Sequence, residues 1–128
     1  MKTVWSDDPT LVEVEAAVGA ICRDFPDEYW RERDEAHEFP WDFYNAMASA
    51  GWVGVAIPEE FGGGGGGITE AAVLLQTVSA SGPAMDGATA LHLSHFGLNP
   101  VVKHRSDPMK HTYLPRGPDG RTRARCRV

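Results

Sequence analysis

The sequence has only two cysteines among its 128 residues, and it has no long apolar run. Cys22 and Cys126 are too few and too far apart for a disulfide framework or a zinc site. No stretch approaches the roughly 20 apolar residues that a membrane-spanning helix needs. The first residues turn acidic where a secretory signal would turn apolar, so we expect a cytoplasmic protein.

Basic residues are scarce in most of the chain and are concentrated at its C-terminal end. Residues 1–115 hold seven basic and seventeen acidic side chains, and residues 116–128 hold five arginines. The acidic body argues against nucleic acid as a partner. We therefore expect one domain over residues 1–115, followed by an arginine-rich tail over residues 116–128.

Apolar residues recur at helical spacing in several segments that proline and glycine separate. This pattern and the chain length predict one all-α domain, an orthogonal bundle of about six helices. The segment 52–57 is apolar but short and ends at Pro58, so it predicts a buried extended connector. The predicted helices begin at Asp8-Pro9, Asp27, Pro40, Thr69, Asp86 and Ser106. The fifth is expected to end at Gly97, with one more helical turn from Pro100 to His104.

Six consecutive glycines, Gly62 to Gly67, formally contain a nucleotide-binding pattern. A dinucleotide site needs its first glycine directly after a strand, and a P-loop needs Lys-Ser/Thr where Ile68-Thr69 stands. A structural turn is therefore the favoured interpretation over a nucleotide site. Since glycine is conformationally permissive, we expect this loop to be mobile.

Few residues suggest catalytic or metal chemistry. His92 and His95 have a spacing that two metal ligands can use, but no further ligand accompanies them, so we predict no metal site. No nucleophile is flanked by a base in a recognisable order. We therefore assign no catalytic residue.

Four blocks of sequence, in this order and spacing, closely resemble the N-terminal helical domain of the acyl-CoA dehydrogenase family. The resemblance covers about residues 8–115. The blocks are Phe39-Pro40 with Ala50-Gly51-Trp52-Val53-Gly54, then Ile57-Pro58-Glu59-Glu60-Phe61-Gly62-Gly63, then Gly67-Ile68-Thr69-Glu70-Ala71-Ala72, and last Phe96-Gly97-Leu98-Asn99-Pro100 with Lys110 to Tyr113-Leu114-Pro115.

The resemblance implies a FAD-dependent oxidoreductase that converts acyl-CoA thioesters to enoyl thioesters in fatty acid metabolism. Members of the family use a glutamate to remove the α proton and pass hydride to flavin. They are usually homo-tetramers that deliver electrons to an electron-transferring flavoprotein. Flavin and substrate lie between a middle and a C-terminal domain, and no residue here matches the motifs of either. We therefore expect the N-terminal fragment of such an enzyme, inactive alone.

The resemblance also implies that one helix lines the acyl pocket. Carried over position by position, the wall residues would be Ala88, Thr89, His92 and Phe96. Their spacing puts them on or beside one face of a helix. Core packing against the preceding helix is an equal alternative, although it explains His92 less well than Phe96. A polar His92 at the wall would limit chain length or contact a polar acyl substituent.

The tail after residue 115 does not resemble the family's continuation, and we expect it to be disordered or translated out of frame. The rival interpretation is a basic tail that docks on an acidic partner or on nucleic acid. A second hypothesis for the whole chain is a non-catalytic helical module that associates with a complete dehydrogenase or another helical protein. That module would expose apolar residues at Trp41, Tyr44, Val73 or Phe96.

Overall fold

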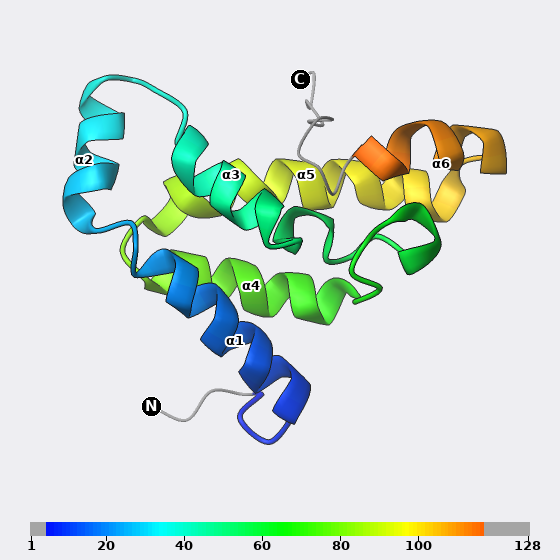
Figure 1. Cartoon of the computed structure of the whole chain (residues 1–128), viewed down its shortest axis with the longest axis horizontal. Coiled ribbons are helices and arrows are strands. Elements are labelled where there is room, and N and C mark those ends of the chain that lie inside the picture. Colours follow the sequence, from blue (N-terminus) through cyan, green and yellow to red (C-terminus); the bar gives the residue numbers. More distant parts are fainter. Residues whose placement is uncertain (1–4, 117–128) are drawn as a thin grey trace.

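The computed structural model describes residues 5–116, in which helices joined by turns and loops are the regular structure and no strand occurs (Figure 1). The prediction of an all-α fold with about six helices is confirmed. The predictions for the tail concern residues that lie almost wholly outside this range. The elements are α1 (Pro9–Cys22), α2 (Asp27–Glu35), α3 (Trp41–Ser49), α4 (Ile68–Ala80), α5 (Ala84–His104) and α6 (Asp107–Tyr113), with short 3-10 helices η1 (Trp52–Gly54), η2 (Glu59–Phe61) and η3 (Leu114–Arg116).

Helix α4 lies between α1 and α5 at the centre of the molecule, and α3 crosses in front of the first half of α5 (Figure 1). Asp8 begins α1 as predicted, because its Oδ1 accepts hydrogen bonds from the amides of Thr10 and Leu11. The buried residues of α1 recur every three or four positions, as do Ala71, Leu74 and Val78 of α4, so each helix turns an apolar stripe toward its neighbour. Together with residues of α3 and α5 they form the main core.

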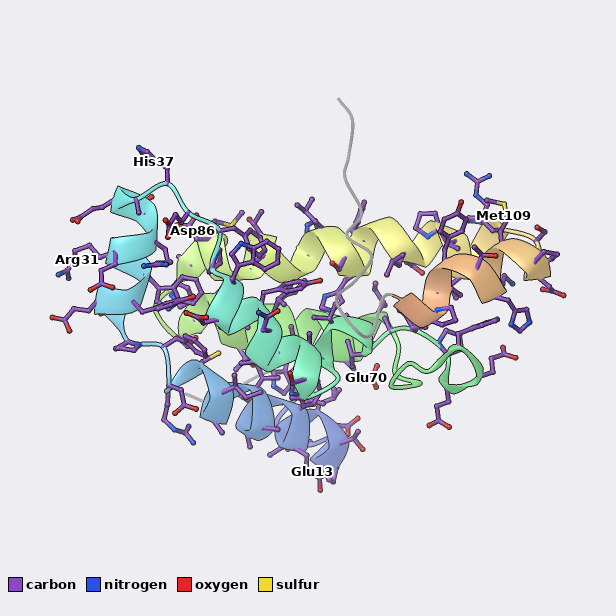
Figure 2. All side chains as sticks on the ribbon, turned by 45° about the horizontal axis from the view of Figure 1, so that its top comes forward. Glu13, Arg31, His37, Glu70, Asp86 and Met109 are labelled. Carbon is purple, nitrogen blue, oxygen red and sulfur yellow. The ribbon has the colours of Figure 1, made fainter. Side chains whose placement is uncertain are left out.

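Charged side chains lie around the outside of this core. Figure 2 shows Glu13 on α1 and Arg31 on α2 pointing away from the body. Within residues 5–116, no helix has both the length and the apolar content needed to cross a membrane.

The connector after α3 is buried as predicted, but the prediction of an extended backbone is wrong. Gly51 has a φ of 86°, so it ends the helix in the left-handed conformation that glycine favours. The chain then winds as successive tight turns, in which Val55 N–H donates to the Trp52 carbonyl and Ile57 N–H to the Gly54 carbonyl. These turns pair backbone groups that would otherwise be buried without partners.

Two predicted helix starts are also wrong. Helix α4 begins at Ile68 rather than Thr69, because the Glu70 carboxylate accepts a hydrogen bond from Gly67 N–H at 2.6 Å. Helix α5 begins at Ala84, which places Asp86 inside its first turn rather than at the cap.

Helix α5 continues past its predicted end at Gly97 as far as His104, with Pro100 inside it. Burial of apolar side chains at the C-terminal end of α5 explains why the helix continues past Gly97. A second, smaller core forms at this end of the molecule from Ile57, Phe61, Leu98 and Leu114. Packing of the helix against η2, α6 and η3 therefore outweighs the backbone hydrogen bond that proline cannot make.

Candidate functional site

One face of α5 is left uncovered by the rest of the described chain. Thr89, His92 and Phe96 lie on it, and Phe96 is 64% exposed. Met85, one turn before Thr89, is 73% exposed. Their spacing of three or four residues places all of them on one side of the helix. This face therefore presents two large apolar side chains beside a hydroxyl and an imidazole.

The rings of His92 and Phe96 lie together on this face. Their centroids are 5.1 Å apart and their planes are inclined by 31°. A pair one turn apart on a helix is expected to meet in this way. The two rings make a continuous aromatic surface with a polar edge at His92.

Ala88 differs from the other three predicted wall residues, because it is buried, with 9% of its surface exposed. It lies at the margin of the exposed face, where α5 turns toward the core. The structure therefore groups three of the four predicted residues on the open surface and places the fourth beneath them.

The opposite face of α5 is packed and hydrogen-bonded. Leu91 is fully buried, and the hydroxyl groups of Ser94 and Tyr44 are 3.5 Å apart. His95 Nε2 donates a hydrogen bond to the Trp52 carbonyl at 2.9 Å. Its Nδ1 is buried without a partner, which is compatible with a neutral ring. Burial lowers the pKa of His95, so this imidazole holds the connector to α5 in its neutral form.

The two histidines that share a metal-compatible spacing therefore lie in different environments. His92 is exposed, whereas His95 is buried and bonded to the backbone. Over residues 5–116 no three histidine, cysteine, aspartate or glutamate side chains gather where they could hold one metal ion.

The glycine loop is fixed against the connector. The amides of Gly63, Gly64, Gly65 and Gly66 donate to carbonyls of Pro58, Gly54, Ile57 and Val55, at 2.9–3.2 Å. A side chain at Gly63 would overlap the Ile57 carbonyl. This anchoring contrasts with the mobile turn that six glycines predict.

The same hydrogen bonds determine whether the glycine loop could bind the flavin that the sequence resemblance implies. A pyrophosphate needs free backbone amides at a glycine turn or a helix N-terminus. Here the loop amides bond to carbonyls, and Gly67 N–H at the start of α4 bonds to Glu70. These residues do not fit a flavin pyrophosphate, so we assign no cofactor-binding residue within the described chain.

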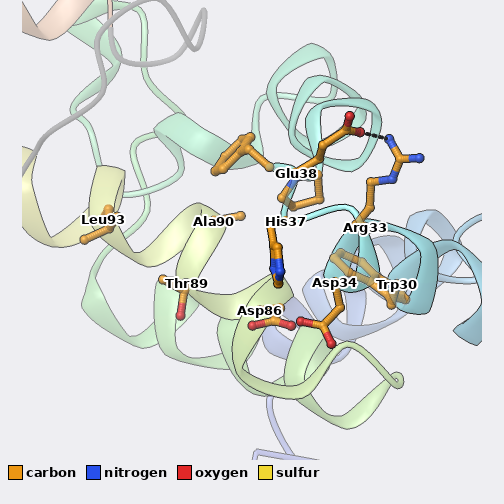
Figure 3. A pocket seen from close by; sticks show the side chains of 11 residues that line it. Trp30, Arg33, Asp34, His37, Glu38, Asp86, Thr89, Ala90 and Leu93 are labelled. Carbon is orange, nitrogen blue, oxygen red and sulfur yellow. Dashed lines mark hydrogen bonds and ion pairs between the residues drawn. The ribbon is translucent and has the colours of Figure 1, made fainter.

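A hollow of about 420 Å³ lies between α2, the loop that follows it and the first half of α5 (Figure 3). Of the predicted wall residues, only Thr89 lines it. No pattern in the sequence predicts this hollow, because helical periodicity does not place α2 relative to α5. One further residue could not be anticipated: His37 at the rim has a φ of 52°, which is uncommon for a residue other than glycine.

The described chain is thus a helical domain with a complete core, one open helix face and no assembled catalytic group. The family model described as "Acyl-CoA dehydrogenase, N-terminal domain" matches residues 8–121, and the chain belongs to this family of oxidoreductases. The match continues past the predicted domain boundary at residue 115.

Curated relatives agree with this assignment. The chain is 34% identical to the acryloyl-CoA reductase (NADH) of Anaerotignum propionicum over 85 residues, which are 66% of this chain and 21% of that protein. It is 28% identical to acyl-CoA dehydrogenase FadE12 of Mycobacterium tuberculosis over 106 residues, 81% of this chain and 26% of the relative. It is 26% identical to the mitochondrial isovaleryl-CoA dehydrogenase of Bos taurus over 88 residues, which are 67% of this chain and 20% of that protein.

The matched segments span between 20% and 26% of the length of these relatives. No solved structure matches the chain. The comparisons therefore assign the family and the domain.

Proposed function

We propose that the exposed face of α5 forms one wall of the acyl pocket in a FAD-dependent acyl-CoA dehydrogenase, and that this chain is inactive alone. One observation carries the proposal: Phe96 is 64% exposed on a helix whose opposite face is fully packed. An apolar face left open on a folded domain is typical of a surface that another component or a ligand covers.

The chemistry of the face suits an acyl group. Methylene groups gain roughly 0.8 kcal/mol each on leaving water, so the rings of His92 and Phe96 offer an acyl chain a favourable surface. Thr89 and His92 add hydrogen-bonding groups that would orient a polar substituent. Holding the chain in one position contributes to the rate of any reaction at its Cα–Cβ bond.

The reaction itself requires groups that the described chain does not assemble. FAD, when bound in an acyl-CoA dehydrogenase, supplies the acceptor for hydride. We propose that FAD, the catalytic base, an electron-transferring flavoprotein and subunit partners belong to the complete enzyme. The lack of a phosphate cradle around Gly63–Gly67 supports this division of roles.

A chimeric enzyme tests the wall directly. Residues 8–116 would replace the matching segment of the FadE12 acyl-CoA dehydrogenase, and kcat and KM would be measured over a series of acyl-CoA chain lengths. Replacing Phe96 with alanine should raise KM most for the chain lengths that reach the helix. Replacing His92 with leucine should shift the preferred chain length or substituent.

The control is Val12→Ala, which truncates an exposed apolar side chain on α1, a helix that α4 separates from α5. This variant should leave the chain-length profile unchanged. The wall proposal is wrong if Phe96→Ala and Val12→Ala give the same profile in a chimera that retains flavin.

The alternative of an interaction module uses the same face, since Met85 and Phe96 would bind a helical partner equally well. Two of the residues that this module was expected to expose, Tyr44 and Val73, are instead buried in the core. Trp41 and Phe96 remain exposed. Recovery of a complete dehydrogenase in stoichiometric complex with the chain would favour the module over a detached wall.

A further inference from the structure

The hollow beside α2 has the size and lining of a small-ligand site and is separate from the open face of α5. Its volume of about 420 Å³ falls within the range of ligand pockets. Trp30 and Ala90, both buried, contribute to its lining, and Leu93 lies at its edge. The indole N–H of Trp30 is already bonded to the Phe25 carbonyl, so the ring adds apolar surface here.

The charged residues of the lining leave an excess of negative charge. Arg33 is the only lysine or arginine among the lining residues, and its Nη1 donates to Glu38 Oε2 at 2.9 Å. Asp34 and Asp86 have no ion pair or side-chain hydrogen bond within residues 5–116. Both carboxylates belong to the lining of the hollow, and in the view of Figure 3 they lie below the ring of His37. Two carboxylates without a cationic partner in the described chain thus share the hollow with the apolar side chains of Trp30, Ala90 and Leu93.

The negative charge of the hollow and its apolar surface together indicate which class of ligand it fits. An anion would meet Asp34 and Asp86, and a wholly apolar molecule would leave both carboxylates uncompensated at its edge. A divalent metal ion is disfavoured because no three suitable side chains gather in the described part of the chain. A cation on an apolar stem meets both requirements, since its charge pairs with the carboxylates and its stem covers the apolar floor.

We infer that this hollow binds an alkylammonium or alkylguanidinium group, with the cation between Asp34 and Asp86 and the stem against Trp30, Ala90 and Leu93. A free organic amine and a lysine or arginine side chain of a partner share this chemistry. The site is distinct from the acyl wall, whose ligand is an anionic thioester, and the two share only Thr89 at their margin.

The test is a titration of the isotopically labelled chain with hexylamine, followed by amide chemical shifts. Hexan-1-ol and hexanoate have the same stem without the positive charge, and MgCl₂ supplies a cation without a stem. Hexylamine should shift the amides of Asp34, Asp86, Ala90 and Leu93 saturably, and the three other probes should not. A capped Ala-Lys-Ala peptide in a parallel titration shows whether a protein side chain is the better source of the amine.

The double variant Asp34→Asn, Asp86→Asn should weaken hexylamine binding roughly tenfold, as expected for the loss of two ion pairs. The matched control is Glu32→Gln, Glu35→Gln, which removes the same charge from exposed positions of α2 outside the hollow. All four residues are exposed, so both variants should give the parent amide spectrum before titration.

The inference is wrong if neither hexylamine nor the peptide shifts these amides, if hexan-1-ol acts as well as hexylamine, or if the control weakens binding equally. None of these results alters the chain-length test of the acyl wall.

Discussion

The two faces of α5 have opposite roles although they belong to one helix. Leu91, Ser94 and His95 are packed into the body and bonded to α3 and the connector. Thr89, His92 and Phe96 bond to no other helix in the described chain. The first face is what makes the domain fold, and the second is available for recognition. A substitution should therefore affect either stability or binding according to the face on which it falls.

The largest effect is expected from Leu91→Ala on the packed face. Removing a fully buried leucine side chain should lower the free energy of unfolding by about 2–5 kcal/mol, because a cavity remains. Phe96→Ala removes a larger side chain from the open face and should change stability by no more than about 0.5 kcal/mol. Urea denaturation of both variants measures the contrast. Equal losses would mean that the two faces do not differ as described.

A smaller effect is expected where the glycine loop supports the connector beneath the packed face. Gly63→Ala places a methyl group against the Ile57 carbonyl and should destabilise by about 1–3 kcal/mol. Gly19→Ala, inside α1, meets its nearest atoms at 3.9 Å and should instead stabilise by up to about 1 kcal/mol. Thermal unfolding of the two variants should move the midpoint in opposite directions. A Gly63→Ala variant as stable as the parent would show that the loop is not anchored.

The buried His95 should make the stability of the domain depend on pH. The folded-state pKa of His95 lies below its unfolded value of 6.5, so the unfolded chain binds a proton first as pH falls. The stability that the neutral ring contributes is therefore complete above 6.5 and is lost as pH falls toward the folded value. The urea midpoint should decline over this range in the parent and in His92→Gln. His95→Gln should remove this part of the decline, and an unchanged profile would contradict the assignment.

The smallest change in stability is expected at the open face, where the effect should instead be on surface properties. Phe96→Ser should leave the unfolding midpoint nearly unchanged and should reduce the binding of an apolar dye such as ANS. Dye fluorescence compared between the parent and this variant measures the effect. If dye binding is unaffected, Phe96 does not contribute to an accessible apolar patch.

The sequence predicted the helices well where a local signal existed. The stripe of α1, its Asp8 cap and the glycine end of α3 follow from periodicity and capping rules. The end of α5 was wrong because Pro100 is a strong local stop signal, and only contacts with residues far along the chain override it. The extended connector was wrong for a similar reason, since an apolar run does not specify whether its backbone pairs in turns or strands.

The candidate site was predictable only in part. The family resemblance pointed to α5, and the structure places Thr89, His92 and Phe96 on its open face and Ala88 beneath it. Nothing local distinguished His92 from His95, because their difference depends on which side of the helix meets the connector. The hollow depends on how α2 and its loop pack beside α5, which no motif in the sequence records.

We propose that this chain supplies a wall of a flavoenzyme site and binds no flavin itself. A visible absorption spectrum of the purified chain, taken after incubation with excess FAD and desalting, tests this proposal. We expect no retained flavin, because the amides of the glycine loop already bond to backbone carbonyls. A stoichiometric flavin spectrum would contradict it and would assign cofactor contacts to residues within this chain.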